Sequence, residues 1–249
     1  MYNNKITTIS YAILACHEAK ELKELLQILN LGKRPIDEIV VLLDKNNYDK
    51  CILSYIYDNV DIVEFNSLDG DFSQQKNKLI SLCTKNYIFN LDADEYVSIM
   101  ECKYIHKILE LNLNVDLFYL PRINTVSGIT LDHVNKWNWN ITKNDDFKNK
   151  LFLDQEYKFD IFLYIKLLKH YNYIIQENEK YIEYYEPIIN YPDIQGRLWK
   201  NNNKIKWVNK VHEKLVGMEN VSRMPVHIIH KKEINKQVYQ NEFYDTILN

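Results

Sequence analysis

The spacing of apolar residues predicts alternating strands and helices in the first part of the chain. Residues 6–15 read as a buried strand, and the leucines at positions 22, 25, 26 and 29 fall on one side of a helix. Further strands are predicted at residues 39–43, 61–65 and 87–91. Such alternation predicts an α/β fold with a mostly parallel central sheet flanked by helices.

Two helix starts can be predicted from capping residues. Ser73 is expected to cap a helix that reaches about residue 83. Ser98 and Glu101 have the spacing of a capping box for the next helix.

The pattern loosens after residue 120. Residues 130–190 are rich in Trp, Tyr, Phe, Asn and Lys, and they are interpreted as an insertion that either shapes an acceptor pocket or forms a plain packing layer. A helix is predicted within it, at residues 159–168. The remaining predicted elements are strands at residues 115–120, 195–199 and 205–211, and a polar helix that begins near Asn235.

Composition narrows the class of protein. With 34 acidic and 31 basic residues and no long basic run, the chain lacks the electrostatic footprint of a nucleic-acid binder. Its four cysteines lie far apart, which predicts neither a zinc knuckle nor a disulfide framework. The short apolar stretch at residues 9–16 is interpreted as a strand and not as a signal peptide, and no segment approaches the roughly 20 residues of a membrane span. A soluble, cytoplasmic protein is expected, in the host cytoplasm if the source is viral.

Clustered carboxylates follow the strand predicted at residues 87–91. Ligands of open α/β sheets bind beyond the carboxyl ends of the strands, where Asp92, Asp94 and Glu95 are expected to lie. Closely spaced carboxylates repel each other unless a cation neutralises them, although a solvated acidic turn is the alternative. Asp44 ends another strand, and it either contacts a ribose or base or caps the next helix. No GxGxxG or GxxxxGK[ST] motif is present, which excludes the dinucleotide and P-loop modes of phosphate binding. The mode that remains is a diphosphate bridged to the protein by a metal ion.

Four sequence blocks carry a family resemblance. Residues 71–77 (DFSQQKN) and 89–95 (FNLDADE) resemble segments of family-2 glycosyltransferases. Residues 191–198 (YPDIQGRL) and 207–213 (WVNKVHE) resemble blocks of the lipopolysaccharide-core β-glucosyltransferase branch and its phage relatives. Lys76 stands where that family usually has Arg, and Asn209 where Gly is usual.

The resemblance implies a single GT-A domain over residues 1–249. Residues 1–97 would form the nucleotide-sugar half, and residues 98–249 the acceptor half with the insertion. The implied activity is metal-dependent and inverting transfer from a UDP-glucose-like donor to an acceptor hydroxyl, the acceptor being a glycan, a lipid-linked molecule or a protein. Two alternatives stay open. A nucleotidyltransferase would carry a Gly-rich basic loop where Cys16, His17 and Glu18 stand, and a catalytically inactive glycan-binding protein could keep the same fold.

The same resemblance assigns roles to particular residues. Glu213 is expected to be the general base, with Asp193 as the second choice, although Asp193 could instead pair with Arg197. Mn²⁺ or Mg²⁺ is expected at Asp92, Asp94 and His230, with His230 preferred over His227. The residues expected to bind the nucleotide sugar are His17, Glu18, Asp44, Lys76, Asp92, Ala93, Arg197, Trp207 and His212.

Overall fold

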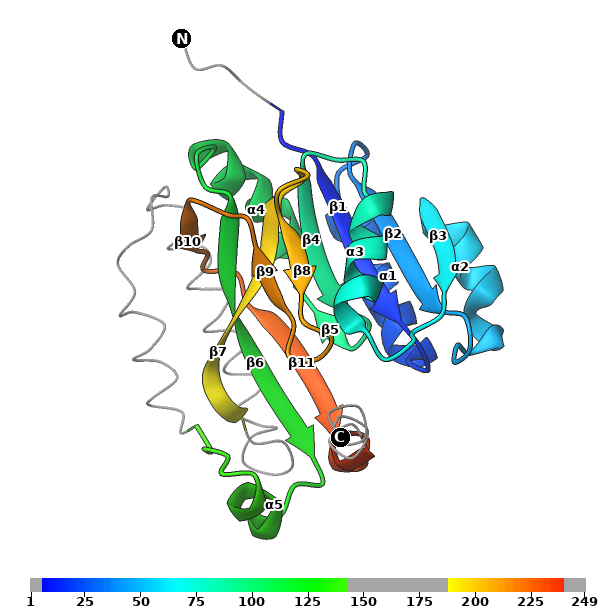
Figure 1. The fold of residues 1–249 in the computed structure, drawn as a ribbon, viewed down its shortest axis with the longest axis vertical. Coiled ribbons are helices and arrows are strands. Elements are labelled where there is room, and N and C mark those ends of the chain that lie inside the picture. Colours follow the sequence, from blue (N-terminus) through cyan, green and yellow to red (C-terminus); the bar gives the residue numbers. More distant parts are fainter. Residues whose placement is uncertain (1–5, 143–187, 240–249) are drawn as a thin grey trace.

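One large twisted sheet forms the centre of the protein. The computed structural model describes residues 6–142 and 188–239. Within these ranges the sheet has nine strands, with the order β3-β2-β1-β4-β7-β6-β11-β5 and with β10 paired to β6 (Figure 1). Strands β7 and β5 run antiparallel to their neighbours, and the other pairings are parallel.

The first part of the chain alternates strands and helices as the apolar pattern predicts. Its elements are β1 (Ile9–Ala15), α1 (Ala19–Gly32), β2 (Glu38–Asp44), the short 3₁₀ helix η1 (Lys50–Ile52), α2 (Leu53–Asn59), β3 (Ile62–Asn66), α3 (Phe72–Leu82), β4 (Tyr87–Asp92), β5 (Glu95–Tyr96) and α4 (Ile99–Leu111).

The second part is dominated by two long strands. Its elements are β6 (Leu117–Ser127), α5 (Leu131–Lys136), β7 (Ile188–Lys200), β8 (Lys206–Val208), β9 (Lys214–Val216), β10 (Val221–Arg223) and β11 (Ile228–Glu233), followed by helical residues 234–239. Strands β8 and β9 pair with each other in a separate two-stranded sheet.

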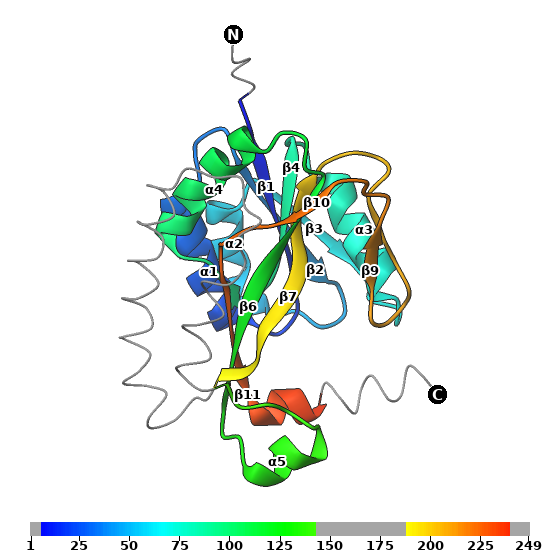
Figure 2. The same ribbon diagram turned by 90° about the vertical axis from the view of Figure 1, so that its left-hand side faces the viewer.

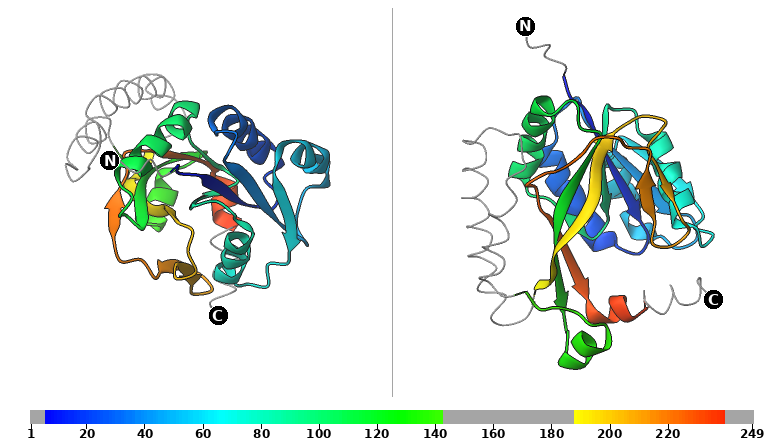
Figure 3. Two further views of the ribbon diagram at one scale, coloured as in Figure 1. Left: turned by 90° about the horizontal axis from the view of Figure 1, so that it is seen from above. Right: turned by 60° about the vertical axis from the view of Figure 1, so that its left-hand side comes forward.

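Both faces of the main sheet are covered. Helices α1, α2 and α4 lie on one face, whereas α3 and the β8–β9 pair lie on the other (Figures 2 and 3). Alternate residues of β1 serve the two layers: Tyr11 and Ile13 pack in the core with α1 and α4, and Ala12 packs in a second core with Leu79 of α3 and Trp207 of β8. Burial on both faces explains the continuous apolar runs of the central strands.

The structure confirms the predicted α/β class and most element positions, with three differences. Asp71, not Ser73, caps α3, because the Asp71 side chain accepts a hydrogen bond from the backbone N–H of Gln74. The strand predicted at residues 205–211 is shorter and belongs to the separate β8–β9 sheet. The strand predicted at residues 195–199 is the end of the thirteen-residue β7. The helix predicted at residues 159–168 lies outside the described residues.

Ser98 and Glu101 form the predicted capping box at the start of α4. The helical residues 234–239 agree with the predicted C-terminal helix. Within the described ranges, no helix combines the length and apolar character that a membrane crossing requires.

Candidate active site

The candidate site lies at the carboxyl edge of the parallel strands. Strand β4 ends at Asp92 and β2 ends at Asp44, so both carboxylates stand at the same edge. Antiparallel β7 is inserted between β4 and β6 and brings Asp193 and Arg197 alongside this edge. The sheet topology therefore joins two blocks that are about a hundred residues apart in the sequence.

A buried guanidinium holds two of the acidic residues together. Arg197 Nη2 lies 2.9 Å from Asp92 Oδ2 and 2.7 Å from Glu95 Oε1. Glu95 is fully buried, and its other oxygen, Oε2, accepts the backbone N–H of Asp92. Burial by itself would raise the pKa of Asp92, but the charges of Arg197 and then of Lys76 outweigh it and hold this pKa well below its ordinary value. Asp92 is therefore ionised at neutral pH.

Asp193 is engaged by three neighbours. Its Oδ2 atom accepts hydrogen bonds from Arg122 Nε and from Asn124 Nδ2, at 2.8 and 2.9 Å, and Arg122 Nη2 lies 2.6 Å away. Oδ1 accepts a hydrogen bond from Gln195. Burial would raise the pKa of Asp193, and the charge of Arg122 leads the interactions that lower it instead. The alternative role of Asp193, an ion pair with Arg197, is not found, because Arg197 bonds Asp92 and Glu95 while Arg122 pairs with Asp193.

His230 and Asp94 face one another across a short gap. His230 Nδ1 lies 2.8 Å from Asn124 Oδ1, and the Asn124 amide is oriented by its donation to Asp193. Nδ1 must therefore carry a hydrogen, so a neutral His230 presents the lone pair of Nε2. That atom lies 3.4 Å from Asp94 Oδ1. At this separation the imidazole and the carboxylate can either pair directly or hold one metal ion together.

A second ion pair lies between α3 and the end of the WVNKVHE block. Lys76 Nζ is 2.7 Å from Glu213 Oε1 and 4.5 Å from the centre of the Trp207 ring. Both charged side chains are largely buried, with 13% and 16% of their surface exposed. Lys76, which is predicted to bind the nucleotide, and Glu213, which is the predicted base, therefore contact each other directly.

Residues at the ends of β1 and β2 lie further along the same edge. Asp44 is buried, and its Oδ1 atom accepts the backbone N–H groups of Asn46 and Leu68. Asp44 does not cap the next helix, because Asp49 is the N-cap of η1. Glu18 accepts the backbone N–H of Cys16, and His17 is exposed.

The structure brings some of the predicted ligands together and separates others. Asp94 and His230 meet, whereas Asp92 is held by Arg197. Within the described ranges, no three His, Cys, Asp or Glu side chains form a ready-made metal site. Asp94 and His230 supply two ligands of the type that Mn²⁺ accepts, so the pair fits a cation whose remaining ligands are diphosphate oxygens and water.

Two further predictions are changed by packing. The Ala93 side chain is only 3% exposed and belongs to the hydrophobic core, so only its backbone can contact a ligand. His227, in contrast to His230, is buried, and its Nε2 atom lies 3.0 Å from the Tyr191 hydroxyl. The preference for His230 as the candidate ligand agrees with this geometry.

Two polar residues of the site, Arg122 and Asn124, are not predicted from the sequence. Glu95 belongs to the predicted acidic cluster, and the structure adds that both Arg122 and Arg197 bond to it. Arg122 and Asn124 lie on β6, outside the four blocks, and become visible only because β6 pairs with β7. Arg122 lies directly opposite Asp193 in the pairing of β6 with β7. The register of these two strands is therefore the information that would identify Arg122 as a site residue.

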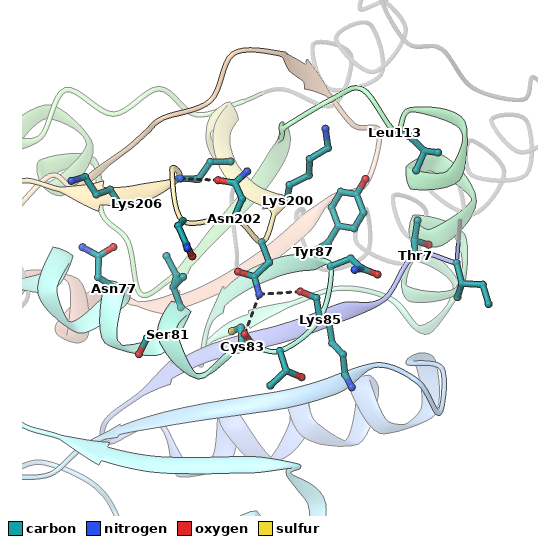
Figure 4. Close-up of a pocket in the computed structure, with 17 residues that line it drawn as sticks. Thr7, Asn77, Ser81, Cys83, Lys85, Tyr87, Leu113, Lys200, Asn202 and Lys206 are labelled. Carbon is teal, nitrogen blue, oxygen red and sulfur yellow. Dashed lines mark hydrogen bonds between the residues drawn. The ribbon is translucent and has the colours of Figure 1, made fainter. Parts of the chain in front are cut away.

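A large pocket lies at the opposite edge of the sheet from the candidate site. It has a volume of about 970 Å³ and is lined at the amino ends of β1 and β4 by residues such as Thr7 and Tyr87 (Figure 4). Its polar groups serve the fold: Asn201 donates to the carbonyl oxygens of Cys83 and Lys85, and Lys200 pairs with Asp116. None of the predicted site residues lines it.

Comparison with known proteins gives a partial structural likeness. No family model matches the sequence, and neither does any curated protein. Among solved structures, residues 1–349 of S. aureus TarS align with a TM-score of 0.41 and 15% identity, over 49% of this chain and 37% of that one. The same TarS fragment in complex with UDP-GlcNAc aligns with a TM-score of 0.40 and 16% identity, over 50% and 36% of the two chains. The likeness spans less than two fifths of the TarS fragment, so conclusions about activity must rest on the site itself.

Proposed function

We propose that this protein is a metal-dependent, inverting glycosyltransferase that transfers a sugar from a nucleoside-diphosphate donor, UDP-linked, to an acceptor hydroxyl. The observation that carries the proposal is the arrangement of Asp94 and His230, whose carboxylate and imidazole face each other 3.4 Å apart beside the ionised Asp92 and could together hold a cation. Carboxylate, imidazole and diphosphate oxygens together are a suitable ligand set for Mn²⁺ or Mg²⁺.

The surrounding residues suit a donor diphosphate. A divalent cation bound by Asp94 and His230 would supply positive charge to the departing diphosphate. Lys76 lies near the start of α3, which follows the carboxyl end of β3, and its charge is one of those that lower the pKa of Asp92. It is therefore a candidate to supply positive charge to a phosphate bound at this edge. Among the described residues, Arg197 Nε and Nη1 are buried and have no hydrogen-bond partner, so this guanidinium beside Asp92 has unused donors.

Glu213 is the preferred general base. Its carboxylate would accept the proton of the acceptor hydroxyl while the hydroxyl oxygen forms a bond to the anomeric carbon. The bond from that carbon to the diphosphate breaks in the same step, and its electron pair leaves with the diphosphate, which inverts the anomeric centre. Asp193 suits this role less well, because Arg122, Asn124 and Gln195 already occupy its two oxygens.

Nucleotide binding tests the proposal without knowledge of the acceptor. We expect UDP to bind in the presence of Mn²⁺ and to bind far more weakly after chelation, as measured by calorimetry. Asp94→Asn should remove the Mn²⁺-dependent part of the UDP affinity. Asp58→Asn, at an exposed position on α2, should leave that affinity unchanged. Transfer or slow hydrolysis with a panel of nucleotide sugars, UDP-glucose among them, would then identify the donor. Absence of Mn²⁺-dependent binding for every nucleoside diphosphate would refute the proposal.

A further inference from the structure

Lys76 stands between the two functional parts of the candidate site. Its Nζ atom is 2.7 Å from Glu213 Oε1, and Lys76 lies near the start of α3, at the carboxyl edge of the sheet where β4 ends at Asp92. The Trp207 ring covers the ammonium group at 4.5 Å and shields it from water. One lysine charge therefore serves the carboxylate proposed as the base and the place proposed for the diphosphate.

A single ammonium group cannot satisfy both partners equally. With no donor bound, the Glu213 carboxylate is its direct partner. A diphosphate placed beside Asp92 carries at least two negative charges, and at the low exposure of this pair it would compete strongly for Lys76. A Glu213 oxygen that remains paired with Lys76 is unavailable to accept a hydroxyl proton.

We infer that Lys76 is a positioning residue that couples donor binding to the release of Glu213. In the free protein Lys76 holds Glu213, and when the donor diphosphate binds, Lys76 transfers to it and leaves Glu213 free for the acceptor hydroxyl. This inference rests on the proposed function. It gives the site an order of events, because both carboxylate oxygens of the base become available only after the donor is in place.

Thermodynamic reciprocity makes this coupling measurable without an acceptor. If diphosphate and Glu213 compete for Lys76, then Glu213 weakens nucleotide binding. Removal of the Glu213 charge should therefore strengthen UDP binding, by about three- to tenfold for a partly buried pair. A base that acts only on the acceptor would leave the affinity for UDP unchanged.

A double-mutant cycle on UDP affinity tests the inference. The dissociation constant for UDP with Mn²⁺ is measured by calorimetry for the wild type, Glu213→Gln, Lys76→Met and the double variant, with thermal melts to confirm folding. We expect tighter binding by Glu213→Gln, weaker binding by Lys76→Met, and no gain from Glu213→Gln in the Lys76→Met background. Lys76→Arg keeps the positive charge, so the gain in UDP affinity from Glu213→Gln should persist in the Lys76→Arg background. If Lys76→Met does not fold, Lys76→Arg with and without Glu213→Gln still tests the inference. Glu219→Gln, which removes an exposed carboxylate after β9, is the charge control and should have no effect.

The outcomes separate the two ideas. Equal UDP affinity of wild type and Glu213→Gln would overturn the coupling and leave the proposed glycosyltransferase function intact. A gain that survives in the Lys76→Met background would be a general charge effect and would also overturn the role of Lys76. Failure of the wild type to bind any nucleoside diphosphate would instead remove the proposed function on which the coupling depends.

Discussion

Arg197 donates from a single nitrogen, Nη2, to Asp92 at 2.9 Å, although the whole guanidinium is buried. The same nitrogen also reaches Glu95. One side chain of β7 thus supplies countercharge both to Asp92 at the end of β4 and to Glu95 in β5, which Arg122 also bonds.

Replacement of Arg197 should be severely destabilising. Arg197→Met leaves the buried Glu95 and the adjacent Asp92 with less positive charge, and removal of one partner from a buried ion pair costs about 3–5 kcal/mol. Urea unfolding measures the loss in the free energy of unfolding. Lys107→Met breaks the exposed pair between Lys107 and Glu110 on α4 and should cost less than about 1 kcal/mol. Similar losses in the two variants would contradict the buried network.

The two candidate bases should differ in the kind of damage that their loss causes. Glu213→Gln should reduce turnover by a factor of about 10² to 10⁴ while the protein still folds, although the ion pair with Lys76 is lost. Asp193→Asn disturbs the bonds with Arg122, Asn124 and Gln195, so it should also lower the free energy of unfolding by about 1–3 kcal/mol. Steady-state kinetics and denaturant unfolding check the pair. The assignment is reversed if Asp193→Asn is stable and inactive while Glu213→Gln still transfers sugar.

His227 predicts a pH dependence of stability. Burial lowers the pKa of His227 to about 3, compared with about 6.5 in an unfolded chain. Between these values the unfolded chain binds a proton that the folded protein does not, so stability falls as pH drops below about 6.5, by up to about 1.4 kcal/mol per pH unit from this group. His227→Gln should flatten the profile between pH 6.5 and pH 4.5. Identical slopes for the wild type and the variant would show that His227 is not held neutral.

Asn77 should control the position of Trp207. Its side-chain amide donates a hydrogen bond to the backbone carbonyl of Trp207 and accepts one from the backbone N–H of Trp207, both at 2.9 Å. These two bonds fix β8 against α3. Asn77→Ala should cost about 1–3 kcal/mol and weaken UDP binding, because Trp207 covers Lys76. Ser81→Ala on the same helix removes only an exposed bond to the Lys78 carbonyl and serves as control. Unchanged UDP affinity in Asn77→Ala would show that the Asn77–Trp207 hydrogen bonds do not contribute to nucleotide binding.

The sequence predicts local structure better than long-range pairing. The apolar runs of β2 and β4 and the capping box at Ser98 depend on neighbouring residues, and the structure confirms them. The position of β7 between β4 and β6 depends on pairings across the whole chain, which no local pattern specifies.

The site shows the same division. Its acidic block could be located because the carboxylates directly follow an apolar strand. The partners of those carboxylates could not, because Arg197 comes from a different strand and Lys76 meets Glu213 across two separate blocks. The metal, the donor sugar and the base remain predictions that the variants above can test.

The late position of β7 also sets the order in which a newly made chain can fold. Asp92 and Arg197 are 105 positions apart, so at ribosomal rates of about 5–20 residues per second Asp92 emerges on the order of ten seconds before its countercharge. During that interval β4 and β6 are already synthesised, and each presents an open edge where β7 must later insert. Direct pairing of β4 with β6 would exclude β7 and leave the acidic cluster without its arginine. Productive folding on the ribosome therefore requires that these two edges stay apart until β7 has been made.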